Sequence, residues 1–316
     1  MNILITGATG FVGRRLVEQL LEDASLSTRA AVRAMNVQDL KCPVVPVGDI
    51  SEKTNWHEAL IDCHVVIHAA ARVHVLHDTV ADPLVEFRRV NVDGTLNLAR
   101  QAIEAGVKRF IFISSIKVNG EETRPGSPYF ADDEPAPQDP YGISKLEAEQ
   151  GLQTLGKHSG MDVVIIRPPL VYGSGVKGNF QTMVKWLGKK VPFPLGSVKN
   201  KRSLVAIDNL TSLISICIKH PKAANQIFLV SDGHDLSTKE LLIKMGRALH
   251  LPVRLLPVPY WLIYITAKIT GKKSIVQRLF GSLQVDISKT RELLGWNPPQ
   301  GVDEALSKVI DSSSRL

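Results

Sequence analysis

The feature that most constrains the fold is a glycine-rich loop at the start of the chain. Residues 2–6 form a short apolar run, and Gly7, Gly10 and Gly13 follow it at three-residue spacing before an amphipathic segment. A strand, a glycine turn and a helix in this order bring backbone N–H groups to an anion such as a pyrophosphate. The pattern therefore predicts a dinucleotide-binding site. The residues predicted to contact the cofactor here are Gly7, Gly10, Phe11, Val12 and Gly13.

Short β-branched runs alternate with longer amphipathic segments from residue 2 to about residue 168. Strands are predicted at 3–6, 29–32, 44–47, 65–68, 110–113 and 163–166. Helices are predicted at 11–22, 83–105 and 140–158. Because the strands are apolar on both faces, the sheet is expected to lie between two layers of helices. The predicted fold class is α/β, with a doubly wound parallel sheet of the Rossmann type.

The composition changes after Pro168, where Gly, Pro and Lys interrupt the apolar pattern to about residue 203. A helix at 207–220 and a strand at 227–230 then restore the α/β pattern. We therefore expect two parts. An NAD(P)-binding domain comprises 1–168 and about 204–231, and a smaller C-terminal substrate-binding lobe comprises about 169–203 and 232–316.

Bulk properties exclude several classes of protein. The 316 residues are 44% hydrophobic and 22% charged, which predicts a sizeable core. Three widely spaced cysteines do not form a disulfide framework, and the N-terminus reads as a strand rather than a basic leader, so a cytoplasmic protein is expected. The longest strongly apolar stretch, 260–267, is shorter than the ~18 residues of a transmembrane helix.

The net charge of +7 is compatible with several anionic partners. Most Lys and Arg residues are scattered among acids and are not interleaved with aromatic residues, which favours phosphate-bearing small molecules over nucleic acid. The apolar segment 260–281 carries four cations and is either a core element or an interfacial helix, so contact with a membrane surface stays open as an alternative.

No metal site is predicted, because His64 and His68 lie too far apart along one extended strand to share an ion. His74 follows the end of that strand and is a candidate to line a substrate pocket.

The adenosine end of the cofactor is expected near the second and third strands. An acid about 20 residues after the glycine loop commonly binds the ribose 2′-hydroxyl of NAD, but the second strand here ends in Arg33. Arg33 suits a 2′-phosphate and favours NADP(H) over NAD(H), the alternative being a solvated surface residue. Asp49 is predicted to contact the adenine, together with Ile50.

Three side chains form the predicted chemical centre. Tyr141 and Lys145 are four residues apart in a predicted helix and so share one face. A tyrosine with a pKa of about 10 is a poor acid or base at neutral pH, and a neighbouring ammonium group stabilises its phenolate. Lys145 can also hold the nicotinamide ribose. Ser115 follows a predicted strand, at the edge of the sheet where ligands bind, and is expected to hydrogen-bond the reacting oxygen.

These features together resemble the extended short-chain dehydrogenases/reductases, specifically their nucleotide-sugar epimerases, dehydratases and reductases. The resemblance spans nearly the whole chain. It rests on the glycine loop, on His68-Ala69-Ala70-Ala71, on Asn91-Val-Asp-Gly94-Thr95, on Ser114-Ser115 and on Tyr141 with Lys145. It implies that Ser115, Tyr141 and Lys145 are catalytic. It also implies that the cofactor site includes His68, Ala69, Ala70 and Pro168, and that the protein is a homodimer.

Further segments resemble the sugar-nucleotide site of that family. Asn179 stands where an Asn contacts a UDP-sugar, and Arg202 stands where an Arg grips the pyrophosphate. Arg278 is a candidate second cation, with a solvated helix face as the equal alternative. The resemblance thus implies a UDP-sugar substrate.

One departure from the family bears on the reaction. Many epimerases carry a Tyr between the catalytic serine and the next glycine, where this chain reads Ser115-Ile-Lys-Val-Asn119-Gly120. The segment resembles 4-ketoreductases of surface-polysaccharide pathways, so we expect an NAD(P)-dependent reductase of a UDP-4-keto-6-deoxy-N-acetylhexosamine. A 4-epimerase of UDP-glucose or UDP-N-acetylglucosamine uses the same residues and stays open. The intact Tyr141 and Lys145 argue against a noncatalytic NADP-binding sensor.

Overall fold

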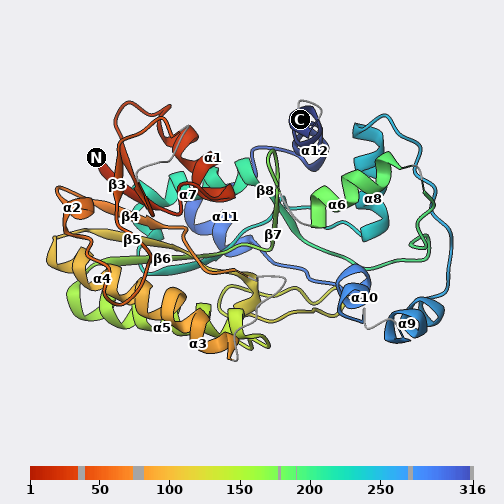
Figure 1. Cartoon of the computed structure of the whole chain (residues 1–316), viewed down its shortest axis with the longest axis horizontal. Coiled ribbons are helices and arrows are strands. Elements are labelled where there is room, and N and C mark those ends of the chain that lie inside the picture. The colour runs from red at the N-terminus through yellow and green to blue at the C-terminus, as the bar shows by residue number, and fades with distance from the viewer. Residues whose placement is uncertain (35–39, 74–81, 177–178, 190, 270–272, 314–316) are drawn as a thin grey trace.

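The computed structural model describes residues 1–34, 40–73, 82–176, 179–189, 191–269 and 273–313 (Figure 1). Its centre is a parallel sheet with the strand order β3-β2-β1-β4-β5-β6-β9. The strands of this sheet are β1 (Asn2–Thr6), β2 (Ser27–Val32), β3 (Val44–Pro46), β4 (Val65–His68), β5 (Arg109–Ile113), β6 (Asp162–Arg167) and β9 (Gln226–Leu229). The order reverses beside β1, which is the doubly wound arrangement expected from the sequence.

Alternating side chains along the strands build a core on each face of the sheet. Ile3 and Ile5 point to one face, where α1 (Phe11–Leu20), α7 (Ile207–Lys219) and α11 (Ser288–Leu294) cover them. Leu4 points to the other face, which is covered by α2 (His57–Leu60), α4 (Gly94–Glu104) and α5 (Pro140–Ser159). Figure 1 shows α1 and α7 above the sheet and α4 and α5 below it. The predicted fold class is therefore confirmed.

The helix predicted at 83–105 is wrong as a single regular element. The segment contains α3 (Pro83–Arg88), a π-helical turn (Arg89–Asp93) and then α4. Gly94 packs closely against Ile50, where an added Cβ would lie 2.6 Å from Cγ2 of that side chain. A wider turn just before this contact is the kind of local adjustment that π-helical segments make near functional sites.

After β6 the chain leaves the main sheet. A second small sheet pairs β7 (Leu170–Tyr172) with β8 (Leu204–Ala206), and α6 (Asn179–Gly188) lies between them in the chain. The chain then returns through α7 to β9, which pairs with β6. The remaining helices are α8 (Thr238–Ala248), α9 (Tyr260–Ile269), α10 (Lys273–Phe280), α11 and α12 (Val302–Ser313). A third core joins α6, α8 and α12.

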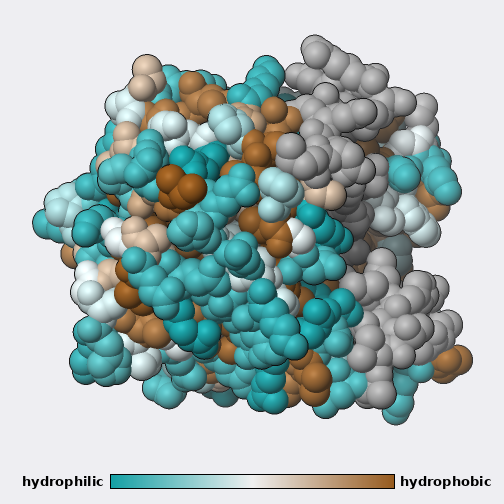
Figure 2. Space-filling model, turned by 60° about the vertical axis from the view of Figure 1, so that its left-hand side comes forward, coloured by the Kyte–Doolittle hydropathy of each residue, from teal (hydrophilic) through white to brown (hydrophobic). Residues whose placement is uncertain are grey.

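The two ends of the molecule differ. Figure 1 places α6, α8, α9 and α10 at the end opposite the N-terminus. The side that carries the N-terminus comes forward in Figure 2 and is mostly hydrophilic, with apolar residues in small separate groups. Within the described residues, no helix combines the length and the apolar character needed to cross a bilayer. The three cysteines are free and buried.

Candidate active site

The glycine loop connects β1 to α1 at the carboxyl edge of the sheet. Gly7 has a φ of +72°, a conformation that disfavours side chains, and an added Cβ would lie 2.6 Å from the Ala70 nitrogen. At Gly13 a Cβ would lie 2.2 Å from the Gly7 carbonyl oxygen. Helix α1 begins after Gly10 with no side-chain cap and no acid in its first turn. The loop therefore has the close backbone packing and the free helix N-terminus that suit a dinucleotide pyrophosphate.

His68, at the end of β4, contacts Thr6, the residue that precedes the glycine loop. Its two ring nitrogens lie 2.6 Å from the Thr6 hydroxyl and 2.9 Å from the Thr95 hydroxyl. Burial, and to a lesser degree the charge of Lys145, lowers the pKa of His68 to about 3, so the ring is neutral. The Thr6 hydroxyl also accepts a hydrogen bond from the Ala70 N–H at 3.3 Å. The His68-Ala69-Ala70 segment thus lies against Gly7, as expected if it lines the cofactor site.

Arg33 and Asp49 lie side by side after the carboxyl ends of β2 and β3. Arg33 Nε is 2.7 Å from Asp49 Oδ1, and the two side chains are 83% and 74% exposed. An exposed ion pair of this kind contributes at most about 1 kcal/mol. Either side chain can therefore turn toward a nucleotide at little cost. Ile50 is partly buried against Gly94 and holds this edge against α4.

Tyr141 and Ser115 meet at the start of α5. Asp139 caps this helix by accepting from the Gly142 N–H at 2.7 Å, and Pro140 occupies the first turn. Burial, followed by the charge of Asp139, raises the pKa of Tyr141 to about 12, while a hydrogen bond with Ser115 lowers it. The phenol is therefore protonated at neutral pH. Lys117 forms an ion pair with Asp139 and offsets the carboxylate beside the phenol.

Lys145 lies one helical turn after Tyr141 and is only 1% exposed. Its Nζ sits 4.0 Å from the centre of the Phe112 ring, a cation–π contact. Burial lowers the pKa of Lys145 to about 7, and the negative charge of Glu149 acts in the opposite direction. The structure therefore places Tyr141 beside Ser115 and places Lys145 one turn further along the same helix, with its pKa close to neutrality.

A buried ionic network beneath this site was not predicted from the sequence. Glu149, one turn beyond Lys145, pairs with Arg167 at the end of β6, with an Nη2–Oε2 distance of 2.6 Å. Ser114 donates a hydrogen bond to Glu149, and Arg167 donates to Asn119 Oδ1 at 3.0 Å. Glu149 and Arg167 are each 1% exposed. The four-residue spacing of Tyr141, Lys145 and Glu149 was the available signal for this network.

Asn91 in the π-helical turn connects two parts of the site. Its side chain donates to the Ser144 hydroxyl at 3.0 Å and to the Arg72 carbonyl at 3.1 Å, and it accepts from the Arg72 N–H. Asn91 therefore ties the loop after β4 to the turn of α5 that carries Lys145.

The predicted substrate contacts are less fully described. The backbone of Arg202 forms isolated β-bridges with Leu236 and Leu283. Its guanidinium donates to the Gly281 carbonyl at 3.1 Å. Asn179 begins α6 and Arg278 lies in α10, but both side chains fall outside the described part of the structure, and His74 is outside it entirely. The Pro168 carbonyl accepts from the Ile116 N–H at 3.0 Å and so lies beside the Ser115 turn.

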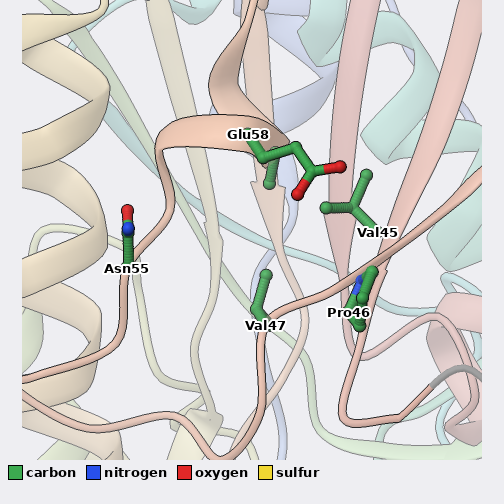
Figure 3. Close-up of a pocket in the computed structure, with 6 residues that line it drawn as sticks. Val45, Pro46, Val47, Asn55 and Glu58 are labelled. Atoms are coloured by element: carbon green, nitrogen blue, oxygen red, sulfur yellow. The ribbon is translucent and has the colours of Figure 1, made fainter.

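A separate surface hollow lies between β3 and α2 (Figure 3). Val45, Pro46, Val47, Asn55 and Glu58 line it, and the Glu58 carboxylate points toward Val45. The hollow contains none of the predicted site residues. Among the described residues, no group of three or more His, Cys, Asp or Glu side chains could hold a metal ion.

Comparisons with known proteins agree with this geometry. Residues 3–231 match the model of the NAD dependent epimerase/dehydratase family. A UDP-glucose 4-epimerase of Vibrio cholerae is 53% identical over 98% of this chain and 95% of its own length. An N-acetyl-α-D-glucosaminyl-diphospho-ditrans,octacis-undecaprenol 4-epimerase of Escherichia coli O157:H7 is 26% identical over 98% of this chain and 94% of its own length.

Solved structures with the same fold cover the whole chain. A UDP-glucuronic acid 4-epimerase from Bacillus cereus in complex with NAD has a TM-score of 0.80 at 21% identity, covering 100% of this chain and 99% of that one. A UDP-glucose 4-epimerase from Thermotoga maritima with UDP-glucose has a TM-score of 0.78 at 21% identity, with the same coverage.

Replacing Lys145 by Met should stabilise the protein in a pH-dependent way. The pKa of Lys145 is about 7 in the folded protein, against an ordinary value of 10.5, so the folded state holds the proton less tightly than the unfolded chain. The resulting loss of folded-state stability is at its maximum below pH 7 and disappears as the pH rises toward 10.5. We expect Lys145→Met to raise the free energy of unfolding by on the order of 5 kcal/mol at acidic pH, from a pKa difference of about 3.5 at about 1.4 kcal/mol per unit, measured by urea unfolding without added cofactor.

The matched control is Lys157→Met, at an exposed position on the same helix, which should change the free energy of unfolding little at any pH. A gain at Lys145 that stays constant across this pH range would contradict the burial of an ammonium group.

Replacing Glu149 by Gln should destabilise the fold strongly, because it leaves the Arg167 guanidinium buried without its carboxylate. The expected loss is about 3–5 kcal/mol in the free energy of unfolding. The control is Asp162→Asn, whose pair with Arg109 is more exposed and whose loss should be about 1 kcal/mol. The double change Glu149→Gln with Arg167→Met should recover part of the stability. Equal losses at Glu149 and Asp162 would refute a special role for the buried pair.

Proposed function

Because the chain belongs to the NAD dependent epimerase/dehydratase family, we propose that it acts at C4 of a UDP-hexose and is a UDP-sugar 4-epimerase. The hydrogen bond between Ser115 and Tyr141, at the sheet edge that holds the glycine loop, carries the proposal of chemistry at C4, and the similarity to a 4-epimerase carries the choice of reaction. The 53% identity to a UDP-glucose 4-epimerase across nearly the full length supports it.

The proposed chemistry follows from the protonation states of the site. A bound nicotinamide cofactor would supply the acceptor and donor for the hydride at C4. Tyr141 exchanges a proton with the C4 oxygen, and Ser115 holds that oxygen by a hydrogen bond. A protonated Lys145 makes the phenolate of Tyr141 easier to form, and Glu149 favours that protonated state. The same groups serve oxidation and reduction, as an epimerase requires.

We also propose that residues 1–168 and about 204–231 hold the cofactor, and that about 169–203 and 232–316 hold the sugar nucleotide. The Arg202 guanidinium joins the two segments of this second part, because it donates to the Gly281 carbonyl in the loop after α10. With Arg278, Asn179 and His74 it forms the proposed contact set for the UDP-sugar. The proposed state is a cytoplasmic homodimer paired through α4 and α5, which pack side by side.

A 4-ketoreductase is the second candidate, and the segment after Ser115 favours it. No aromatic residue lies between Ser115 and Gly120, and the interior of this turn is filled by Val118 and Asn119, which are 0% and 2% exposed. Asn119 donates to the Phe130 carbonyl at 3.0 Å and accepts from Arg167. The turn is thus built around a polar side chain where many epimerases place a tyrosine, and surface-polysaccharide synthesis is the corresponding pathway.

Product analysis separates the two reactions. An epimerase should interconvert UDP-glucose and UDP-galactose, or UDP-N-acetylglucosamine and UDP-N-acetylgalactosamine, without net loss of absorbance at 340 nm. A ketoreductase should instead consume NADH or NADPH in stoichiometric amounts with a UDP-4-keto-6-deoxy-N-acetylhexosamine. Tyr141→Phe should lower either rate by at least about 10²-fold while the protein still unfolds cooperatively. Full activity in that variant would refute the role of Tyr141.

Arg33 is the proposed determinant of cofactor choice. Its guanidinium suits the 2′-phosphate of NADP(H), which NAD(H) lacks. We expect Arg33→Ala to weaken NADPH binding about tenfold, the equivalent of about 1.4 kcal/mol, and to change NADH binding less than about twofold, measured by fluorescence titration. Asp49→Asn, which alters the partner of Arg33 but keeps the guanidinium, is the control. Equal losses of both cofactors in Arg33→Ala would contradict the assignment.

A further inference from the structure

The end of the molecule opposite the N-terminus carries an unusual group of exposed apolar side chains. Six of them, in α9 and the loop before it, are between 40% and 79% exposed, and we call them the apolar patch. They are Leu256, Tyr260, Trp261, Leu262, Ile265 and Ile269. Single exposed apolar residues are ordinary on protein surfaces, but a group of this size in one short segment marks an interaction site.

Helix α9 contacts α10 on one side, where Ile263 and Tyr264 are partly buried, and leaves apolar side chains exposed on the other. Trp261, Ile265 and Ile269 recur every four residues and so form one outward stripe. The helix is held from its other side, where the Tyr260 ring lies 5.1 Å from that of Phe280 in α10. Figure 1 shows α9 at the extremity of the molecule, outside α10. A helix that is apolar all round is normally buried, so the outward face needs a partner.

The patch continues across the neighbouring chain segments. The Leu256 N–H donates to the Phe193 carbonyl at 2.8 Å, and the Phe193 ring lies 6.3 Å from that of Trp186 at the end of α6. Trp186 is itself 49% exposed. The surface therefore carries two exposed tryptophans and one exposed tyrosine, the aromatic residues that concentrate at membrane–water interfaces.

The charge of this end complements an anionic surface. Residues 163–207 and 241–285 contain no Asp or Glu, although some of their cations pair with acids from other segments, as Arg167 does with Glu149, Lys201 with Glu240 and Lys244 with Asp303. Lys185, Lys189, Arg254 and Lys268 are exposed in the elements that carry the patch and Trp186. A UDP-sugar brings about two negative charges, which two or three cations satisfy. These four exposed cations are separate from Arg202 and Arg278, the cations proposed for the UDP-sugar, and they favour a larger anionic partner.

We propose that this face docks on a membrane surface that contains anionic phospholipids. The outward stripe of α9 enters the boundary between headgroups and acyl chains, and the exposed cations contact the lipid phosphates. A second copy of the chain is disfavoured as the occupant, because pairing this face with itself would bring the exposed Lys185, Lys189, Arg254 and Lys268 of both copies together. The docking is peripheral, and it would hold the sugar-nucleotide site beside a lipid surface.

Vesicle co-sedimentation of the full chain tests this proposal. At low salt the protein should bind vesicles of phosphatidylcholine with roughly 30% phosphatidylglycerol, and it should not bind vesicles of phosphatidylcholine alone. Binding should weaken as salt is raised, because the charge contacts are exposed. Trp261→Ser with Ile265→Ser should weaken it at least tenfold, and Lys268→Glu about fivefold or more. The control is Ile61→Ser, which removes an exposed apolar side chain at the other end of the molecule.

Tryptophan fluorescence gives an independent readout. Of the four tryptophans, Trp56 and Trp296 are buried, so a blue shift on adding anionic vesicles reports Trp186 and Trp261. Thermal unfolding confirms that each variant is folded. The proposal is overturned if the protein ignores anionic vesicles, or if the double variant binds them as well as the parent. It is also overturned if the patch instead mediates self-association, seen as a dimer that sedimentation velocity detects in the parent and not in the double variant.

Discussion

The ion pair between Glu149 and Arg167 is the interaction on which the candidate site depends. It joins α5 to β6 in the interior, and through Ser114 and Asn119 it also reaches the end of β5 and the turn after it. These are the elements that carry Tyr141, Lys145 and Ser115. Burying two charges is expensive, so each must find its partners. That requirement fixes the relative positions of helix, strand and turn more tightly than apolar packing alone.

The fold could be predicted from the sequence, and a chemical centre proposed from it, because both depend on local patterns. The glycine loop, the apolar strands and the spacing of Tyr141 and Lys145 are each readable within a few residues. The Glu149–Arg167 pair joins positions 18 residues apart, and the Asn91–Ser144 contact joins positions 53 apart. Nothing local distinguishes such a buried polar residue from a solvated one. The helix predicted at 83–105 failed for a related reason, since its π-helical turn precedes the close packing of Gly94 on Ile50.

The end of the molecule that carries α9 and α10 could not be interpreted from the sequence for a different reason. Its sequence shows an apolar segment with cations, which fits a core helix as well as an interfacial one. Only the packing decides, because it shows which face of α9 meets α10 and which faces solvent. The body of the molecule around the sheet is mostly hydrophilic on the side seen in Figure 2. The molecule therefore has one apolar, basic end and one hydrophilic side. This asymmetry is what the proposed docking on a planar anionic surface requires.

The same burial moves the two central titrating groups in opposite directions. It raises the pKa of Tyr141 to about 12 and lowers that of Lys145 to about 7. Both shifts favour neutral forms, so the phenol keeps its proton at neutral pH and is a weaker acid than an ordinary tyrosine. Reaction in the oxidising direction needs the phenolate, and therefore needs Lys145 to carry its charge. Glu149 raises the pKa of Lys145 against the effect of burial. The buried network thus positions the site, and in the proposed reaction it also favours the charged lysine that the oxidising direction needs.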